Sequence, residues 1–257
     1  MTRSQAAARA LFAVLALLSL SAQRDPILVP EVSQHEVQVR QGFTGTELLL
    51  YGAILDPDGR RARQPYDIVV VLKGPTTPIL LREKEKKFGI WLNAQNTSFR
   101  SAPSFFAVAS SRPVADIVDD RTAAIYELGL NFLQLSPSGA IDPAEQARFT
   151  AGLVDLRRRE GLYKEDGTGV KINNGVLYQA RIALPSQVVT GRYTAETFAI
   201  TRGRVISSAI AEVDVRKLGF ERFVAEQADK SAILYGLFAV ALSLFMGWLA
   251  GRVFALV

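Results

Sequence analysis

The sequence contains no cysteine, a single histidine, two tryptophans and two methionines among its 257 residues. Without cysteine there is neither a disulfide bond nor a thiol nucleophile, so the stability of the fold has to come from packing. A zinc site would need carboxylates for nearly every ligand, which is unusual for zinc. A Ser-His-Asp triad could use only His35, which we expect to be a packed or edge residue on the strand face of Val37 and Val39.

Motifs for phosphate and calcium binding are also missing. Neither GxxxxGK[ST] nor GxGxxG occurs, and the acidic turns DPDG (56–59) and KEDGTG (164–169) lack the twelve-residue pattern of a calcium loop. The net charge of +5 is too small to indicate nucleic-acid binding. We therefore expect no cofactor, no metal and no nucleic acid. Hydrolysis by two carboxylates stays open, because any two acids can meet in a fold.

The apolar residues gather at both ends of the chain. Near the start, Arg3 and Arg9 precede the run ALFAVLALLSLSAQ, which is the order of a secretory signal peptide with cleavage after Ser21 or Ala22. The run is short for a membrane span, which favours cleavage over the alternative of an uncleaved anchor. We therefore expect residues 1–22 to be a signal peptide and the following body to be exported.

The other end, LYGLFAVALSLFMGWLAGRVFALV, is also apolar. Residues 232–251 carry no charge, and this length suits an α-helix that crosses a ~30 Å hydrocarbon core. Tyr235 and Trp248 suit the two interfaces, and Arg252 follows on the side that the positive-inside rule makes cytoplasmic. The sequence predicts a transmembrane helix and short tail over 232–257. The protein would be single-pass in a bacterial inner membrane, with its body in the periplasm and its C-terminus in the cytoplasm.

Small residues recur every four positions in this segment, at Ala239, Ser243, Gly247 and Gly251. They share one helix face, and the GxxxG spacing of the last two allows another helix to approach closely. Spans rich in Gly and Ala also contain such spacings by chance, so helix packing and plain composition stay open as readings. The partners to consider besides the lipid bilayer are a multi-pass membrane protein and a second copy of this chain.

Between the ends, the pattern is mainly that of β-strands. HEVQVR alternates, while TELLLYGAI and YDIVVVL are apolar runs typical of strands buried on both faces. KKFGIWLNA and SFFAVASS predict two more short strands, and EKEKK (83–87) predicts a solvated edge or turn. VLYQARIALP, GRYTAETFAI and RVISSAIAEVDVRK then resume the alternation. Several short strands at near-regular spacing predict an all-β sandwich.

One stretch indicates the kind of sandwich. In IALPSQVVTGRYTAETFAI a strand ends at proline, a turn follows, and Gly191-x-Tyr193 starts the next strand. This form is common in immunoglobulin-like sandwiches, where the tyrosine fastens the corner. We therefore expect a mainly β protein with an immunoglobulin-like β-sandwich body, a helical-hairpin insertion and a C-terminal single transmembrane helix.

The helical insertion follows from a change of period in the middle of the chain. One helix is expected from residue 119 to 132, and a second starts at Asp142 as its cap and Pro143 in its first turn, with arginines at 157–159 in its last turn. The residues expected on the apolar faces of the two helices are Ile125, Leu128, Phe132, Phe149, Leu153 and Leu156. The predicted organisation is a first β region (27–113), the insertion (114–165), a second β region (166–217) and a juxtamembrane helix (218–231).

The segments EVSQHEVQVRQGFTGTELLLYGAI (31–54) and LYGLFAVALSLFMGWLAGRVF resemble a family of alphaproteobacterial transmembrane proteins, Alph_Pro_TM. The most specific part is GFTG (42–45) leading into ELLL (47–50). The family has no established activity, so the resemblance implies a membrane protein without assigning catalytic residues. By analogy it also implies a permease of the sulfite-exporter type as a companion.

Three functions are compatible with these features. The first is a membrane-anchored, non-enzymatic periplasmic accessory protein that supports or docks onto another envelope protein, such as a transporter. The second is a tethered module that binds a solute or an envelope polymer, for which Trp91, Phe99, Phe105 and Phe106 could line a concave site, although core packing also explains these aromatics. The third is a carboxylate-based hydrolase with two buried acids facing one cleft. The anchor and the small residues favour the first.

Overall fold

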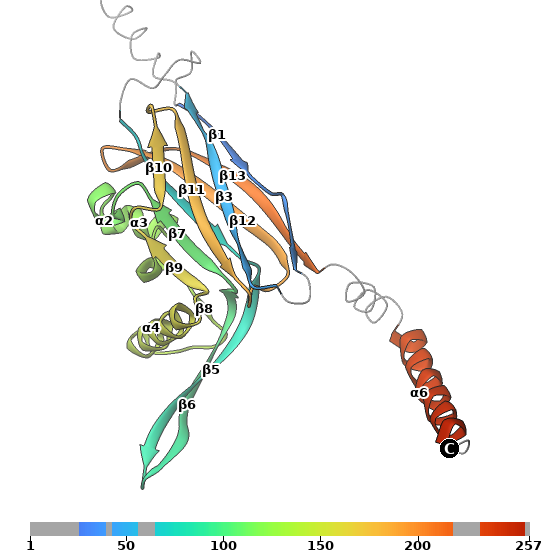
Figure 1. Ribbon diagram of the computed structural model, residues 1–257. Helices are drawn as coiled ribbons and strands as arrows, with labels where there is room; N and C mark the ends of the chain where they lie inside the picture. Colours follow the sequence, from blue (N-terminus) through green and yellow to red (C-terminus); the bar gives the residue numbers. More distant parts are fainter. Residues whose placement is uncertain (1–25, 40–42, 56–64, 218–231, 255–257) are drawn as a thin grey trace, which may run out of the picture.

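A computed structural model describes residues 26–39, 43–55, 65–217 and 232–254 of the chain (Figure 1). The predicted signal peptide (1–22) and juxtamembrane helix (218–231) lie outside the described residues, as does Gly42, the first residue of GFTG. The described chain is mainly β, and it ends in one apolar helix. A mainly β body with a C-terminal helix is therefore confirmed.

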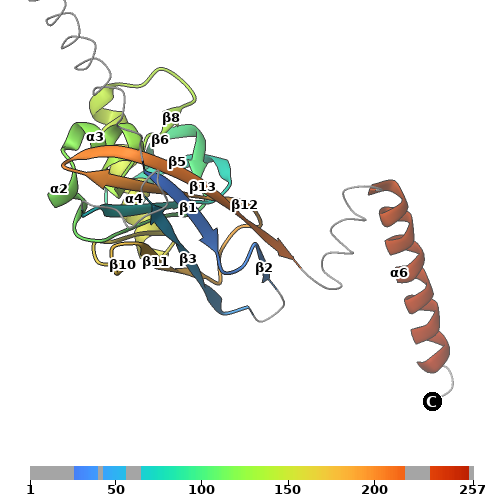
Figure 2. The ribbon, with the colours of Figure 1, turned by 90° about the horizontal axis from the view of Figure 1, so that it is seen from above.

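Two sheets form the body. One has the order β1-β3-β11-β10, made of β1 (Ile27–Val32), β3 (Gly45–Leu55), β11 (Leu177–Pro185) and β10 (Val170–Asn173). The other has the order β2-β13-β12-β4-β7-β9, made of β2 (Glu36–Val39), β13 (Arg204–Lys217), β12 (Gly191–Thr201), β4 (Asp67–Lys73), β7 (Phe106–Ser110) and β9 (Tyr163–Asp166). The sheets contact each other through β1 with β13, β11 with β7 and β10 with β4, and Figure 2 shows them from one end.

The strand order is that of an immunoglobulin-like domain. In the letters used for such domains, β1-β3-β11-β10 corresponds to A-B-E-D, and β13-β12-β4-β7 to G-F-C-C′. The early strand β2 pairs in parallel with the last strand, β13. All other neighbours in the two sheets are antiparallel except β7 and β9, which are also parallel. The predicted immunoglobulin-like sandwich is confirmed.

The core lies between the sheets, and its central strand is β4. Residues 68–72 of β4 are fully buried, as the apolar run YDIVVVL predicted for a strand with both faces covered. The corner tyrosine is also confirmed, since the Tyr193 hydroxyl donates a hydrogen bond to the Val189 carbonyl at 2.8 Å. Burial raises the pKa of Tyr193 to about 12. Two residues on, buried Ala195 stands where antibody domains carry a disulfide cysteine.

The helical insertion lies between β7 and β10, beside the β7–β9 edge of the sandwich (Figure 1). It comprises α2 (Val114–Ile117), α3 (Asp120–Tyr126), the 3₁₀ helix η1 (Leu130–Phe132), β8 (Ser136–Pro137) and α4 (Pro143–Arg159). Asp142 caps α4 as predicted, because its side chain accepts hydrogen bonds from the backbone N–H groups of Ala144 and Glu145.

Two details of the helix prediction were wrong. The first helix does not continue to Phe132, because Glu127 adopts a left-handed backbone with a φ of 52° and ends α3. The apolar faces were also too wide, since Ile125 is 63% exposed and Leu156 47% exposed. Phe149 and Leu153 are the residues of α4 that enter the core. The helices cover an edge of the sandwich, so each of them needs only a narrow apolar face.

A long β-hairpin was missed by the sequence analysis. It consists of β5 (Thr76–Lys87) and β6 (Ile90–Pro103), joined by a turn at Phe88 and Gly89, and its far end projects from the body (Figure 1). The expected single strand KKFGIWLNA was wrong, because this turn divides it. EKEKK lies on the exposed part of β5 beside that turn rather than forming a turn itself. The hairpin joins strands C and C′ of the sandwich.

Candidate functional site

The C-terminal helix α6 (Ala232–Phe254) is the clearest functional element of the chain. Its 23 residues extend about 35 Å, which is enough to cross a ~30 Å hydrocarbon core. The window Tyr235–Arg252 has a mean hydropathy of 1.3, and none of it is buried inside the protein. A core helix of a soluble domain would be largely buried, so α6 has the length, composition and exposure of a membrane-spanning helix.

The predicted interfacial residues lie toward the two ends of α6. Tyr235 and Arg252 are about 25 Å apart along the helix axis, so each falls close to one boundary of a ~30 Å core. Trp248 lies one turn before Arg252, and its ring contacts that of Phe245 with centroids 6.2 Å apart. All three predicted residues are exposed and available to lipid headgroups.

The small-residue face of α6 consists of Ala239, Ser243, Gly247 and Gly251. All four are exposed in the structure. Apart from the backbone of α6 itself, a Cβ atom added at either glycine would meet no atom within 4 Å. The two glycines are therefore not required by any contact within the described part of the chain, and the face is open to a second helix.

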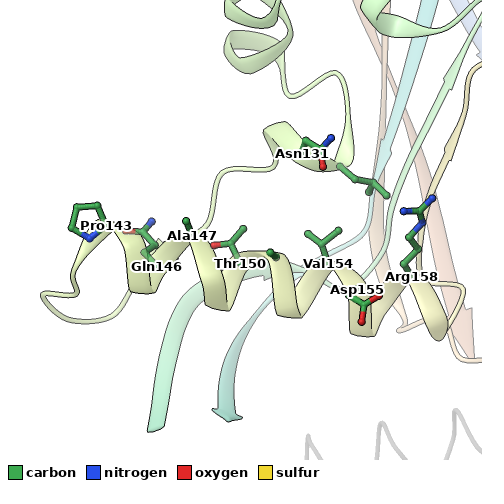
Figure 3. Close-up of a pocket in the computed structure, with 10 residues that line it drawn as sticks. Asn131, Pro143, Gln146, Ala147, Thr150, Val154, Asp155 and Arg158 are labelled. Atoms are coloured by element: carbon green, nitrogen blue, oxygen red, sulfur yellow. The ribbon is translucent and has the colours of Figure 1, made fainter.

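The helical insertion itself carries a groove of about 600 Å³ between η1 and α4. Figure 3 shows Gln146, Thr150 and Val154 of α4 on the side that faces Asn131. No aromatic residue lines this groove. Phe99, Phe105 and Phe106, which the second function could place in a concave site, are fully buried in the core, as the alternative of core packing predicted.

The single histidine lies at the surface. The His35 side chain is 72% exposed, and its Nε2 is 3.0 Å from Glu31 Oε1, so His35 is an edge residue rather than a packed one. In the parts of the chain that the structure describes, no three His, Asp or Glu side chains gather closely enough to hold a metal ion.

A partly buried charge cluster connects the insertion to the sandwich. Lys73 Nζ lies 2.6 Å from Glu127 Oε2 and 3.9 Å from Glu196 Oε2. The other carboxylate oxygen of Glu127 accepts a hydrogen bond from the backbone N–H of Gln134. These contacts join β4, β12 and the end of α3, so Glu127 holds the end of α3 against the sandwich.

A second ion pair connects the start of β4 to the segment that follows β7. Arg112 donates hydrogen bonds to both carboxylate oxygens of Asp67, at 2.9 and 2.7 Å, and Ser111 donates a third at 3.0 Å. Partial burial alone would raise the pKa of Asp67, but the bonds from Arg112 and Ser111 outweigh it and lower the pKa. Asp67 is therefore held ionised between β4 and the end of β7, in the manner of a structural carboxylate.

The family described as "Putative transmembrane protein (Alph_Pro_TM)" matches residues 27–255. The chain belongs to this family. The match includes both the sandwich and all of α6, and no curated protein matches the chain. Family membership and the exposed apolar helix together make this Alph_Pro_TM protein membrane-anchored and single-pass.

The hairpin end of the Alph_Pro_TM chain is a surface feature that sequence reasoning missed. Phe88, in the turn, is fully exposed, and Ile90, Trp91 and Leu92 are exposed beside it. The signal was present in the sequence, because Gly89 separates the charged run EKEKK from the apolar IWL and can adopt the positive φ that it has here.

Proposed function

We propose that this Alph_Pro_TM chain is a non-enzymatic accessory protein of the bacterial inner membrane. Its sandwich lies in the periplasm after removal of a signal peptide, and its short tail lies in the cytoplasm. The small-residue face of α6 docks onto a helix of a multi-pass membrane protein. A permease of the sulfite-exporter type is the first partner to test, by family analogy.

The observation that carries this proposal is an apolar helix with an open face of small residues. Lipid tails are as apolar as leucine, so helices in a bilayer associate through close packing rather than through the hydrophobic effect. Small side chains at every fourth position permit the short interhelical distance that such packing requires. Gly247 and Gly251 have no packing role within the described chain that would explain them.

The sandwich supports an accessory role through its charged groups. The partly buried charged side chains of the sandwich form ion pairs with each other, Lys73 with Glu127 and Asp67 with Arg112. Each pair joins two structural elements, so these groups hold the insertion and the start of β4 in place. A rigid body of this kind suits a partner-supporting role.

Paired leucine substitutions test the docking directly. The Gly247→Leu, Gly251→Leu variant fills the small-residue face and prevents close helix approach, while α6 stays long and apolar. We expect a multi-pass protein to co-purify with the wild type in mild detergent and to be reduced ten-fold or more with the variant, which corresponds to about 1.4 kcal/mol. Co-purified proteins are identified and quantified by mass spectrometry.

The matched control is Ala241→Leu, which adds apolar volume about 140° around the helix from the centre of the small-residue face. It should leave co-purification unchanged. Equal recovery with the paired variant and the wild type would contradict the proposal. So would recovery of a second, differently tagged copy of this chain as the main partner of the small-residue face.

A tethered binding module is the second candidate, and the groove between η1 and α4 is the observation that favours it. Thr150 and Gln146 supply hydrogen-bonding groups there, and Arg158 at one end supplies a positive charge (Figure 3). This function depends on the groove and not on α6. It predicts that the paired leucine variant retains full function, whereas the accessory role predicts that function is lost with the body and anchor intact.

A further inference from the structure

The outermost part of the β5–β6 hairpin, residues 84–93, has the composition of a membrane-contacting tip. Phe88 is 103% exposed and Trp91 67% exposed, and Ile90 and Leu92 add more uncovered apolar surface. Within the described chain this is the projecting end of the hairpin, beyond the last contacts of β5 and β6 with α4. Large apolar side chains gathered at such an end indicate a binding surface rather than a core.

Lysines surround this apolar end. Lys86 is paired with Trp91 and Lys87 with Ile90 across the two strands, and Lys84 follows one step behind on the face of Lys86. Paired residues of an antiparallel hairpin share a face, so each face of the tip has an apolar residue with a lysine beside it. One of these lysines, Lys87, also lies 3.2 Å from Glu85. The tip therefore has a net positive charge behind an apolar end.

The topology places this tip at the end of the sandwich where β13, the last strand before α6, finishes. Strands β4 and β13 run in the same direction, because each is antiparallel to β12 on one side of it. Lys73, which ends β4, and Glu212 of β13 both pair with Thr194. Strand β5 begins three residues after Lys73, so the hairpin and the end of β13 leave the sandwich at the same end (Figure 1).

The lengths of the chain segments allow α6 to span the bilayer while the hairpin tip reaches the surface of the same bilayer. Arg148 of α4 binds Glu83 at 3.2 Å and also contacts Gln95, so the hairpin is held against the insertion directly behind the tip. Beyond this level the tip extends only about 17 Å at the ~3.4 Å rise of a strand. Residues 218–231 can span up to roughly 50 Å between β13 and α6, so the covalent connection allows the tip to reach the bilayer surface.

We propose that the hairpin tip inserts into the headgroup region of the same bilayer that holds α6. Phe88, Ile90 and Trp91 enter the interface, and the lysines of β5 contact anionic lipid headgroups. Aromatic side chains prefer this depth, and lysines close to the surface are attracted to anionic lipid. The tip would give the sandwich a second point of attachment and so a fixed orientation over the membrane. This contact needs no protein partner and stands independently of docking by α6.

Tryptophan fluorescence tests the contact in the full-length protein. The sequence has two tryptophans, so Trp248→Phe leaves Trp91 as the single reporter. The protein is reconstituted into vesicles of phosphatidylcholine and phosphatidylglycerol, with or without lipids brominated near the headgroup end of the acyl chains. We expect the brominated lipids to quench Trp91 emission roughly two-fold or more, as for an interfacial tryptophan, and aqueous iodide to quench it weakly.

Two variants test the chemistry of the tip in the Trp248→Phe background. Replacing Phe88 and Ile90 by serine should abolish quenching by the brominated lipids, because Trp91 alone then has to hold the tip in the interface. Replacing Lys84, Lys86 and Lys87 by glutamate should abolish it in vesicles that contain phosphatidylglycerol. The body should keep its circular dichroism spectrum in both variants, because the altered residues are exposed.

A reporter at the opposite end of the sandwich supplies the control. Leu177 is 55% exposed at the start of β11. Strand β11 runs from Leu177 toward the hairpin side, because its end leads into the start of β12, which pairs with the end of β4. Leu177→Trp, in a chain with Trp91→Phe and Trp248→Phe, should be quenched by iodide and not by brominated lipid. The proposal is overturned if Trp91 behaves like this control. The vesicles contain no partner protein, so this result would leave the docking proposal untouched.

Discussion

Arginine at position 242 is expected to release the protein from the membrane. Leu242 lies at the middle of the apolar segment 232–251, and its side chain is exposed on α6. A charged residue at the centre of a transmembrane helix costs about 2.5–3.5 kcal/mol on insertion scales. The mean hydropathy of the span is only 1.3, so this cost should prevent stable insertion while leaving the sandwich folded.

Alkaline carbonate extraction of membranes measures this effect. Wild-type protein should resist extraction, and the Leu242→Arg variant should appear in the soluble fraction. Leu242→Phe keeps the segment apolar and should behave as the wild type. Carbonate removes peripheral contacts, so attachment through the hairpin tip would not conceal the loss of the anchor. Retention of the arginine variant in the extracted membranes would show that α6 is not what anchors the protein.

Alanine at Gly52 is expected to destabilise the sandwich strongly. Gly52 lies at the middle of β3, paired with Pro30 on one side and Tyr178 on the other. A Cβ atom there would lie 2.2 Å from the Val29 carbonyl oxygen and 2.6 Å from the Tyr178 hydroxyl. The backbone can relieve this overlap only if β1 moves away from β3. We therefore expect the free energy of unfolding to fall by about 4 kcal/mol, within the range of severe core substitutions.

Thermal unfolding followed by circular dichroism in detergent measures this loss. The midpoint should fall by about 10 °C for a domain of this size. Gly139→Ala is the control, because a Cβ atom there meets nothing within 4 Å, and its midpoint should stay within about 2 °C of the wild type. An unchanged midpoint for Gly52→Ala would mean that β1 does not pair with β3 as the structure has it.

The sequence predicted the features of the fold that depend on strong local patterns. The fully buried strand β4 was visible as an uninterrupted apolar run, and the corner at Tyr193 was visible as a strand, a turn and a Gly-x-Tyr start. The cap at Asp142 was equally clear, because an acid before a proline satisfies the first free N–H groups of a helix. Each of these signals acts over a few residues and needs no knowledge of the tertiary fold.

The hairpin and the exact helix faces could not be predicted in the same way. The outer half of β5 and β6 is exposed on both faces, so it lacks the alternation of buried and exposed residues that marks a strand packed on a core. Its aromatic residues were read as core or cleft candidates, whereas Trp91 lies on a projecting tip. Ile125 has helical spacing but is exposed, because the sandwich edge covers only part of α3.

In the candidate site, too, features of a single segment were predictable, whereas features that depend on the tertiary fold or on a partner were not. Local sequence predicted the membrane helix, because the bilayer requires the same length and apolar character of every spanning helix. The interfacial and packing roles assigned to its residues stay predictions. The partner of that face could not be predicted, since helix packing depends on a second surface. The position of the hairpin at the end from which β13 leaves the sandwich is a property of strand order, which no short segment of sequence specifies.

Cysteine labelling offers the most direct test of the central claim, a single-pass protein with its sandwich outside the inner membrane. The chain has no cysteine, so one introduced thiol reports on one position. Ala140 is exposed in the insertion, and Val257 follows α6 in the sequence. In intact spheroplasts a membrane-impermeant maleimide should label Ala140→Cys and not Val257→Cys, and lysis should expose both. Labelling of Val257→Cys but not of Ala140→Cys before lysis would contradict the account.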